Sequence, residues 1–289
     1  MSSKPGWIKA EAPGESEPEV KVGEILSEFE LNTVCREADC PNQGECWSEG
    51  TATFMILGRK CTRNCRFCDV ETGNPAGEVN RNEPEQLKRG VKRLGLDYVV
   101  LTSVDRDDLK DGGAGVFRTA IEEIKQLSSP PLVEGLIPDF SGEVSSLEKI
   151  CESGVDVVGH NVETVKRLTP EVRDCRAGYD QSLFVLEALK DLDPDLVTKS
   201  SIMLGLGEEK EEVIETLDDL RRAEVDIVTL GQYMRPTKEQ LPVERFWEVS
   251  EFEELKRRGE EMGFSGVVSG PFVRSSYRAR ETYLKARGG

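Results

Sequence analysis

Residues 51–70, TATFMILGRKCTRNCRFCDV, place a short apolar run directly before three closely spaced cysteines. The run at 51–57 has the length and residue types of a buried β-strand, and Gly58 follows it. Cys61, Cys65 and Cys68 come next in a CxxxCxxC pattern. Active-site groups of parallel α/β folds collect beyond the carboxyl ends of the strands. We therefore expect these thiols to lie at that end of the sheet.

The rest of the chain repeats this order of strand and helix. Five more apolar runs predict strands, at residues 98–103, 132–137, 155–159, 198–204 and 227–230. Amphipathic patterns predict helices at residues 83–95, 115–127, 146–154, 179–192 and 211–225. Parallel strands need crossover helices, so six successive βα units predict an α/β fold, a partial (β/α)6 TIM-type barrel.

We expect three regions along the chain. Residues 1–50 form an N-terminal cysteine-rich extension, with a short helix through Val22, Ile25, Leu26 and Phe29. Residues 51–262 hold the partial barrel. Residues 263–289 form a C-terminal tail of apolar and glycine-rich character, which we expect to cap one mouth of the barrel.

Composition and charge exclude several classes of protein. The net charge is −17, which disfavours a nucleic-acid partner because a polyanion would be repelled. No apolar run approaches the roughly 20 residues that cross a bilayer, and the N-terminus lacks a secretory signal. We expect a cytoplasmic protein whose cysteines stay reduced. A solvated surface explains the acidity, and adaptation to high internal salt is the alternative.

Cysteine spacing points to a metal centre. Thiolates suit zinc or iron–sulfur clusters, but structural zinc takes four ligands and often uses histidine, of which the chain has one, His160. Three close thiols instead leave one iron of a four-iron cluster open to a substrate or cofactor. A zinc loop is the alternative. Cys151 and Cys175 have no partner spacing, and we expect both to be buried structural thiols.

A second triplet narrows the interpretation. Cys35, Cys40 and Cys46 follow a C-x4-C-x5-C pattern. The CxxxCxxC triplet is the signature of radical S-adenosylmethionine enzymes, and from Val20 onward the chain closely resembles the lipoyl synthase family. The resemblance rests on these two triplets and on the segments VVLTSVDRDDLKDGGA, HNVETV, IMLGLGE, QYMRPTKE and VRSSY.

The resemblance implies two 4Fe-4S clusters. In such enzymes Cys61, Cys65 and Cys68 would hold one cluster, whose fourth iron binds S-adenosyl-L-methionine and yields a 5′-deoxyadenosyl radical. The first triplet would hold an auxiliary cluster together with a serine of the terminal RSSY motif. We assign this ligand to Ser275, with Ser276 as the alternative.

The same resemblance implies the reaction, in which two sulfur atoms are inserted at C6 and C8 of a protein-bound octanoyl-lysyl group. Neither carbon has a polarising neighbour, so acid–base catalysis cannot remove the hydrogens and a carbon radical is needed. A cluster held by one weak oxygen ligand would be a suitable sulfur donor.

Several further residues are candidate cofactor contacts. The resemblance places Phe67 beside the adenine, and Asn161 or Glu163 near the cofactor. Lys199 and Ser201 are candidates for the methionyl carboxylate, with a barrel-interior role equally open. Arg235 would pair with an anion or brace its own loop.

Partners also follow from the resemblance. The octanoyl carrier would be the glycine-cleavage H protein or a lipoyl domain of a 2-oxoacid dehydrogenase acyltransferase. Electrons would come from ferredoxin or flavodoxin, and iron–sulfur carrier proteins would supply clusters. We expect a basic patch near Arg274, Arg278 and Arg280 for the acidic carrier. The alternatives are another radical enzyme with an auxiliary cluster, such as a biotin synthase or methylthiotransferase, and a non-catalytic electron carrier or zinc scaffold.

Overall fold

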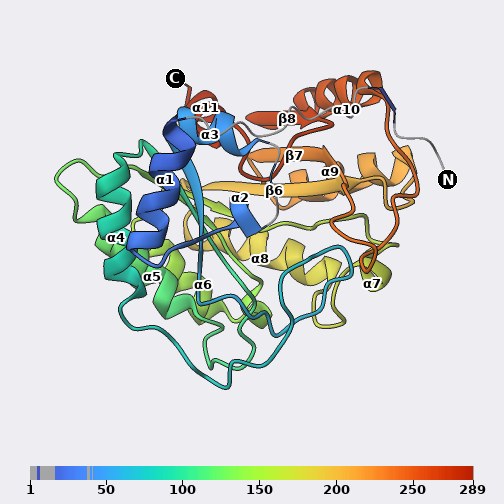
Figure 1. Cartoon of the computed structure of the whole chain (residues 1–289). Coiled ribbons are helices and arrows are strands. Elements are labelled where there is room, and N and C mark those ends of the chain that lie inside the picture. Colours follow the sequence, from blue (N-terminus) through green and yellow to red (C-terminus); the bar gives the residue numbers. More distant parts are fainter. Residues whose placement is uncertain (1–4, 7–16, 38–39, 41, 289) are drawn as a thin grey trace.

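The structure is a computed structural model that describes residues 5–6, 17–37, 40 and 42–288 (Figure 1). Within these residues, one sheet runs from β1 to β8 in sequence order. The short β1 (Asn32–Thr33) pairs antiparallel with β2 (Thr51–Ile56), and every later pairing is parallel. The parallel strands that follow are β3 (Tyr98–Ser103), β4 (Leu132–Leu136), β5 (Val157–Gly159), β6 (Val197–Leu204), β7 (Ile227–Gln232) and β8 (Gly266–Gly270).

This sheet confirms the predicted partial barrel. All six expected strands are present as β2 to β7, and their ends differ by at most two residues from those predicted. The described strands include no ladder from β8 back to β1 or β2, so the sheet is open. Strand β8 was not predicted, because its sequence GVVSG offers only two consecutive apolar residues between small ones.

The crossover helices lie outside the curved sheet (Figure 1). They are α4 (Glu83–Leu94), α5 (Ala114–Lys125), α6 (Val144–Cys151), α8 (Tyr179–Leu192), α9 (Lys210–Arg222) and α10 (Val249–Glu261), and the first five confirm predicted helices. Each buries one apolar stripe and leaves its charged face outside, as α5 does with Phe117, Ile121 and Ile124. Shorter elements are η1 (Phe140–Gly142) after β4 and α7 (Thr169–Val172) after β5. None of the helices in the described ranges combines the length and apolar character needed to cross a bilayer.

The two ends of the chain meet across the open edge of the sheet. The N-terminal region contributes α1 (Glu17–Glu28), α2 (Val34–Glu37) and α3 (Gln43–Ser48), and the chain ends with α11 (Ala279–Ala286). Asn42 Nδ2 donates to Phe272 O at 2.7 Å, and Thr53 Oγ1 donates to Ser276 Oγ at 3.0 Å. Beyond β8 the tail therefore crosses from β7 and β8 to β2, which places α3 and α11 near each other in Figure 1.

A buried ion pair occupies the barrel interior. Lys199 Nζ lies 2.9 Å from Glu134 Oε1, and both side chains are at most 3% exposed. The Tyr98 hydroxyl donates to the other oxygen of this carboxylate at 2.7 Å. Removing one partner of such a pair leaves a buried charge without compensation, which costs more than the pair itself contributes.

We predict that Lys199→Met lowers the free energy of unfolding by about 3–5 kcal/mol, because Glu134 would be left unpaired in the interior. Denaturant titration measures this change. Lys210→Met, which removes a half-exposed pair with Glu254 at the protein surface, is the matched control and should change little. Equal effects of the two substitutions would contradict the prediction.

Candidate active site

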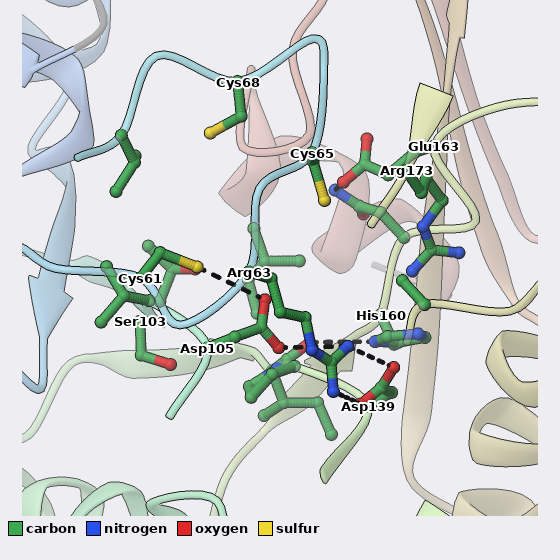
Figure 2. Close-up of a pocket in the computed structure, with 18 of the residues that line it drawn as sticks. Cys61, Arg63, Cys65, Cys68, Ser103, Asp105, Asp139, His160, Glu163 and Arg173 are labelled. Atoms are coloured by element: carbon green, nitrogen blue, oxygen red, sulfur yellow. Dashed lines mark hydrogen bonds and ion pairs between the residues drawn. The ribbon is translucent and has the colours of Figure 1, made fainter. Parts of the chain in front are cut away.

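A cavity of about 280 Å³ opens at the carboxyl ends of the central strands. Met55 near the end of β2, Thr102 of β3 and Leu136 of β4 line it. Cys61, Cys65 and Cys68 line it as well, and Figure 2 shows their sulfur atoms directed into the space below their loop. The predicted position of the triplet, beyond the end of the first long strand, is thus what the structure shows.

Arg63 anchors the cysteine loop to the sheet. Its side chain is 3% exposed and lies between Cys61 and Cys65 in sequence. Nη1 and Nη2 donate to the two carboxylate oxygens of Asp139 at 2.7 Å each (Figure 2). Nε and Nη2 also donate to Asp107 at 2.8–3.2 Å. A third carboxylate, Asp105, lies 3.4 Å from Nη1. One guanidinium therefore ties the loop to the ends of β3 and β4.

Sequence reasoning missed this anchor. Asp105 and Asp107 lie shortly after the end of β3. The argument that placed the cysteines beyond the carboxyl end of a strand could therefore have identified these aspartates as well. Asp139 is positioned by an unusual turn, in which Phe140, Ser141 and Gly142 all have positive φ, of 46°, 56° and 75°. The Asp139 carboxylate accepts the Ser141 N–H at 2.9 Å. Such strain persists where surrounding contacts impose it.

Burial sets the protonation of the groups around the thiols. It raises the pKa of Cys61 to about 11 and that of Cys65 to about 12, with Asp105 adding repulsion in both cases. Burial also raises the pKa of Asp105 to about 6 against the opposing charge of Arg63. The metal-free thiols are therefore protonated near neutral pH, and metal binding would release their protons.

The donor set fits an iron–sulfur cluster. No three His, Cys, Asp or Glu side chains in the described ranges are placed to hold a single metal ion together. In a four-iron cluster each thiolate binds a different iron, so the ligands surround the group instead of meeting at one atom. Soft thiols around a shared cavity match that requirement.

Three of the expected cofactor contacts line the cavity, namely Phe67, Asn161 and Glu163. Glu163 has a positive φ of 67°, because its backbone bridges to Ser201 O and Met203 N of β6. Its carboxylate accepts Asn161 Nδ2 at 3.2 Å. Burial raises the pKa of Glu163 from its usual value.

Arg173 is a cavity residue that sequence reasoning missed. It is 7% exposed and lies beside Glu163 in Figure 2. Nη1 donates to Ser182 Oγ at 2.8 Å, whereas Nε has no hydrogen-bond partner in the described part of the chain. An arginine in the polar segment VRDCRAG carries no sequence signal for such a position.

His160 is structural and neutral. Its Nδ1 faces Ile137 O at 3.0 Å and its Nε2 faces Ser182 Oγ at 2.9 Å. A carbonyl oxygen only accepts, so Nδ1 of His160 carries the proton. Nε2 accepts a hydrogen bond from the Ser182 hydroxyl, and the oxygen of that hydroxyl accepts one from Arg173 Nη1. Burial, followed by repulsion from Arg173, lowers the pKa of His160 to about 4.

Other expected contacts lie elsewhere. Lys199 is paired with the Glu134 carboxylate in the barrel interior and lines none of the described cavities, which supports the interior role that the sequence left open. Arg235 is exposed and braces its own loop, with Nε donating to Gln240 O at 2.8 Å. Ser201 accepts from Thr229 Oγ1 at 2.8 Å and lines a second cavity of about 220 Å³.

The second triplet forms a separate pocket. Cys35, Cys40 and Cys46 line it together with Thr53 of β2 and Ser276. Ser275 instead lines the second cavity, with Ser201. Successive residues of the tail therefore face different cavities. This geometry favours Ser276, the alternative to Ser275 in the sequence analysis, as the serine beside the three thiols. Burial, with repulsion from Cys40, raises the pKa of Cys46 to about 12.

The two remaining cysteines behave differently from each other. Cys151 is partly buried near the end of α6, whereas Cys175 is exposed. The expectation that both are buried is wrong for Cys175, because it lies in the outer loop that precedes α8.

We predict that Arg63→Gln lowers the free energy of unfolding by about 3–5 kcal/mol, since three carboxylates would lose their shared cation. The loosened loop should also expose its thiols, so alkylation of Cys61, Cys65 and Cys68 in metal-free protein should be faster. Denaturant titration and peptide mass spectrometry measure the two effects. Arg66→Gln is the control in the same loop, because Arg66 is exposed and its side chain donates to a neutral carbonyl, Glu171 O. Unchanged alkylation in Arg63→Gln would contradict the anchor.

His160 predicts a pH dependence of stability. The folded-state pKa of His160 lies below its ordinary value of 6.5, at about 4, so the unfolded chain binds the proton first as pH falls. Its contribution to the free energy of unfolding is complete above pH 6.5 and decreases by about 3 kcal/mol in total as pH falls to about 4. His160→Gln keeps hydrogen-bonding groups but cannot titrate, so its stability should depend less steeply on pH in this window. Parallel curves for the two proteins would refute the assignment.

Comparison with known proteins agrees with this geometry. The family model for the radical SAM superfamily matches residues 55–220. Among solved structures, methylornithine synthase aligns with a TM-score of 0.56 at 15% identity, covering 94% of this chain and 77% of that one. The FeFe-hydrogenase maturase of Carboxydothermus hydrogenoformans aligns with a TM-score of 0.60 at 13% identity, covering 93% and 69%. At these identities the two structures support the fold alone.

Curated relatives are much closer in sequence. Lipoyl synthase of Halorhodospira halophila is 56% identical over 276 residues, which cover 96% of this chain and 82% of the relative. Lipoyl synthase of Pyrobaculum arsenaticum is 56% identical over 290 residues, covering 100% and 97%. Lipoyl synthase of Deinococcus radiodurans is 51% identical over 286 residues, covering 99% and 86%. With two thiol triplets in neighbouring cavities of a partial barrel, the chain belongs to the lipoyl synthase family of the radical SAM superfamily.

Proposed function

We propose that the protein acts as a lipoyl synthase, which inserts two sulfur atoms at C6 and C8 of an octanoyl group on a lysine of a carrier protein. The observation that carries this proposal is the arrangement of the two thiol triplets. Cys61, Cys65 and Cys68 line the main cavity, and the second cavity shares part of its wall, including Asn161 and Glu163. The second cavity in turn shares Arg274 with the pocket of the other triplet.

The residues fit two 4Fe-4S clusters and S-adenosyl-L-methionine, the cofactors of this family. Cys61, Cys65 and Cys68 would hold the first cluster. Cys35, Cys40, Cys46 and Ser276 would hold the auxiliary one, on the N-terminal extension (1–50) and on the tail that follows β8, the last strand of the sheet. When bound, these groups supply an oxidant for unactivated C–H bonds and a source of sulfur.

The chain's own polar residues would orient the cofactor. Arg173 lines the main cavity, and its Nε has no hydrogen-bond partner among the residues that the structure describes, so it suits the carboxylate of the cofactor better than Lys199 does. Glu163 and Asn161 offer an acceptor and a donor for hydroxyl or amino groups. Phe67 lines both the main cavity and the second cavity, where its ring can pack against a base.

Apolar residues of the cavity suit an octanoyl chain and exclude water. Met55, Leu136 and Ile137 line the main cavity, and Val34 of α2 reaches it from the N-terminal extension. Because α2 also carries Cys35, the extension that holds one thiol of the second triplet helps to enclose the first cavity.

The substrate is an octanoylated protein. We propose the glycine-cleavage H protein or a lipoyl domain of a 2-oxoacid dehydrogenase acyltransferase as carrier, with ferredoxin or flavodoxin as electron donor. The expected basic patch is not formed jointly by the three tail arginines. Arg274 lines inner cavities, and Arg278 is paired with Glu45 and Glu281.

The test is anaerobic incubation of reconstituted protein with S-adenosylmethionine, dithionite and an octanoyl-lysyl peptide. We expect mass spectrometry to show two sulfurs replacing two hydrogens. Ser276→Ala should lose most of this product, because one ligand of the sulfur donor is removed, while Ser275→Ala should retain it. An unmodified peptide in the presence of cleaved S-adenosylmethionine would contradict the function. If Ser275→Ala loses the product while Ser276→Ala retains it, the ligand of the auxiliary cluster is Ser275, as the sequence analysis assigned it.

A further inference from the structure

Arg274 lies where two cavities meet. It belongs to the segment between β8 and α11, two residues before Ser276. Its side chain lines the second cavity, with Ser201 and Ser275, and it also lines the pocket of Cys35, Cys40 and Cys46. The guanidinium is therefore part of the wall between the central space of the barrel and the second thiol triplet.

The backbone holds Arg274 closely in this position. Nη1 donates to Val273 O at 2.8 Å and to Gln232 O of β7 at 3.4 Å. A Cβ at Gly231 would lie 2.0 Å from Val273 O and 3.6 Å from Nη1 of Arg274. Glycine at position 231 thus lets the tail approach β7 closely enough to direct the arginine inward.

The charge of Arg274 has no carboxylate partner among the described residues. Two other buried arginines differ in this respect, since Arg63 pairs with three aspartates and Arg106 pairs with Asp108. Both hydrogen-bond acceptors of Arg274 are neutral carbonyls. Burial lowers the pKa of Arg274, and the nearby Cys40 acts in the opposite direction. A partly buried cation without a counter-ion is costly unless an anion occupies the adjoining space.

The adjoining pocket is the proposed site of an anionic group. Three thiolates and a serine alkoxide together outweigh the positive charge of the iron–sulfide core, so a cluster bound there carries net negative charge. Reduction by one electron makes the net charge of this cluster more negative. A fixed cation in the wall would therefore stabilise the bound cluster, and the reduced form more than the oxidised form.

We propose that Arg274 is a positioning residue that supplies the counter-charge of the auxiliary cluster, raising its reduction potential and retaining it in the pocket. This inference rests on the proposed function, because it needs a cluster on the second triplet. Arginine suits the role because its charge persists over the whole working range of pH.

The experiment isolates the auxiliary cluster in the full-length chain. A Cys61→Ser, Cys65→Ser, Cys68→Ser background removes the first cluster, so that about four irons per chain remain on the second triplet. Arg274→Met, Arg274→Lys and Arg280→Met are then compared in this background. Arg280 is an exposed arginine of the same tail and serves as the matched control.

Redox titration followed by electron paramagnetic resonance gives the midpoint potential, and iron release to a chelator gives cluster retention. We expect Arg274→Met to have a more negative potential and several-fold faster iron release than the background protein. Arg274→Lys should lie near the background because it keeps the charge, and Arg280→Met should be unchanged. An unchanged potential and unchanged iron release in Arg274→Met would overturn the proposal.

Two further outcomes are informative. If Arg274→Met binds no cluster, iron retention in Arg274→Lys decides, since rescue by the lysine supports a charge role and its failure overturns it. If the background protein itself binds no iron, the cluster assignment of the proposed function fails before Arg274 is tested. The two failures are therefore distinguishable.

Discussion

The site depends on one guanidinium. Three thiols in an eight-residue stretch cannot fix their own positions, because a short loop has too few internal contacts. Arg63 supplies the missing constraint by joining this loop to Asp105, Asp107 and Asp139, which extend from β3 and β4. The pairing is strong because the groups are largely removed from water, and because the bidentate geometry with Asp139 fixes orientation as well as distance. The left-handed turn after Asp139 is part of this arrangement.

A second constraint comes from the open edge of the sheet. A closed barrel would leave no room between β8 and β2, whereas this sheet leaves an edge that the two chain ends cover. The contacts of Asn42 with Phe272 and of Thr53 with Ser276 join segments more than 200 residues apart. The second thiol triplet lies in this junction. Incomplete closure of the barrel and the presence of a second pocket are therefore one structural feature.

Much of the fold was predictable because the apolar runs are short and are bounded by glycine, proline or polar residues. All six expected strands form, and the thiol loop follows the first long one as expected. Strand β8 escaped prediction because pairing with β7, and not its composition, makes it a strand. Lys199 shows a second limit of prediction from the sequence. A lysine at a strand position looks available for a ligand, but only the register of β4 and β6 beside β5 reveals that Glu134 takes its charge.

The sequence by itself determined the cysteine spacing, the βα alternation and the family, since each depends on residues that are near one another in the chain or match known segments. Tertiary structure alone decided which serine faces the second triplet, which arginines point inward and which lysine is already paired. Those outcomes depend on side-chain direction and on contacts between distant strands. A shift of one residue exchanges Ser275 for Ser276 between two cavities. No local pattern encodes that choice, because it is made where the tail crosses β7 and meets β2.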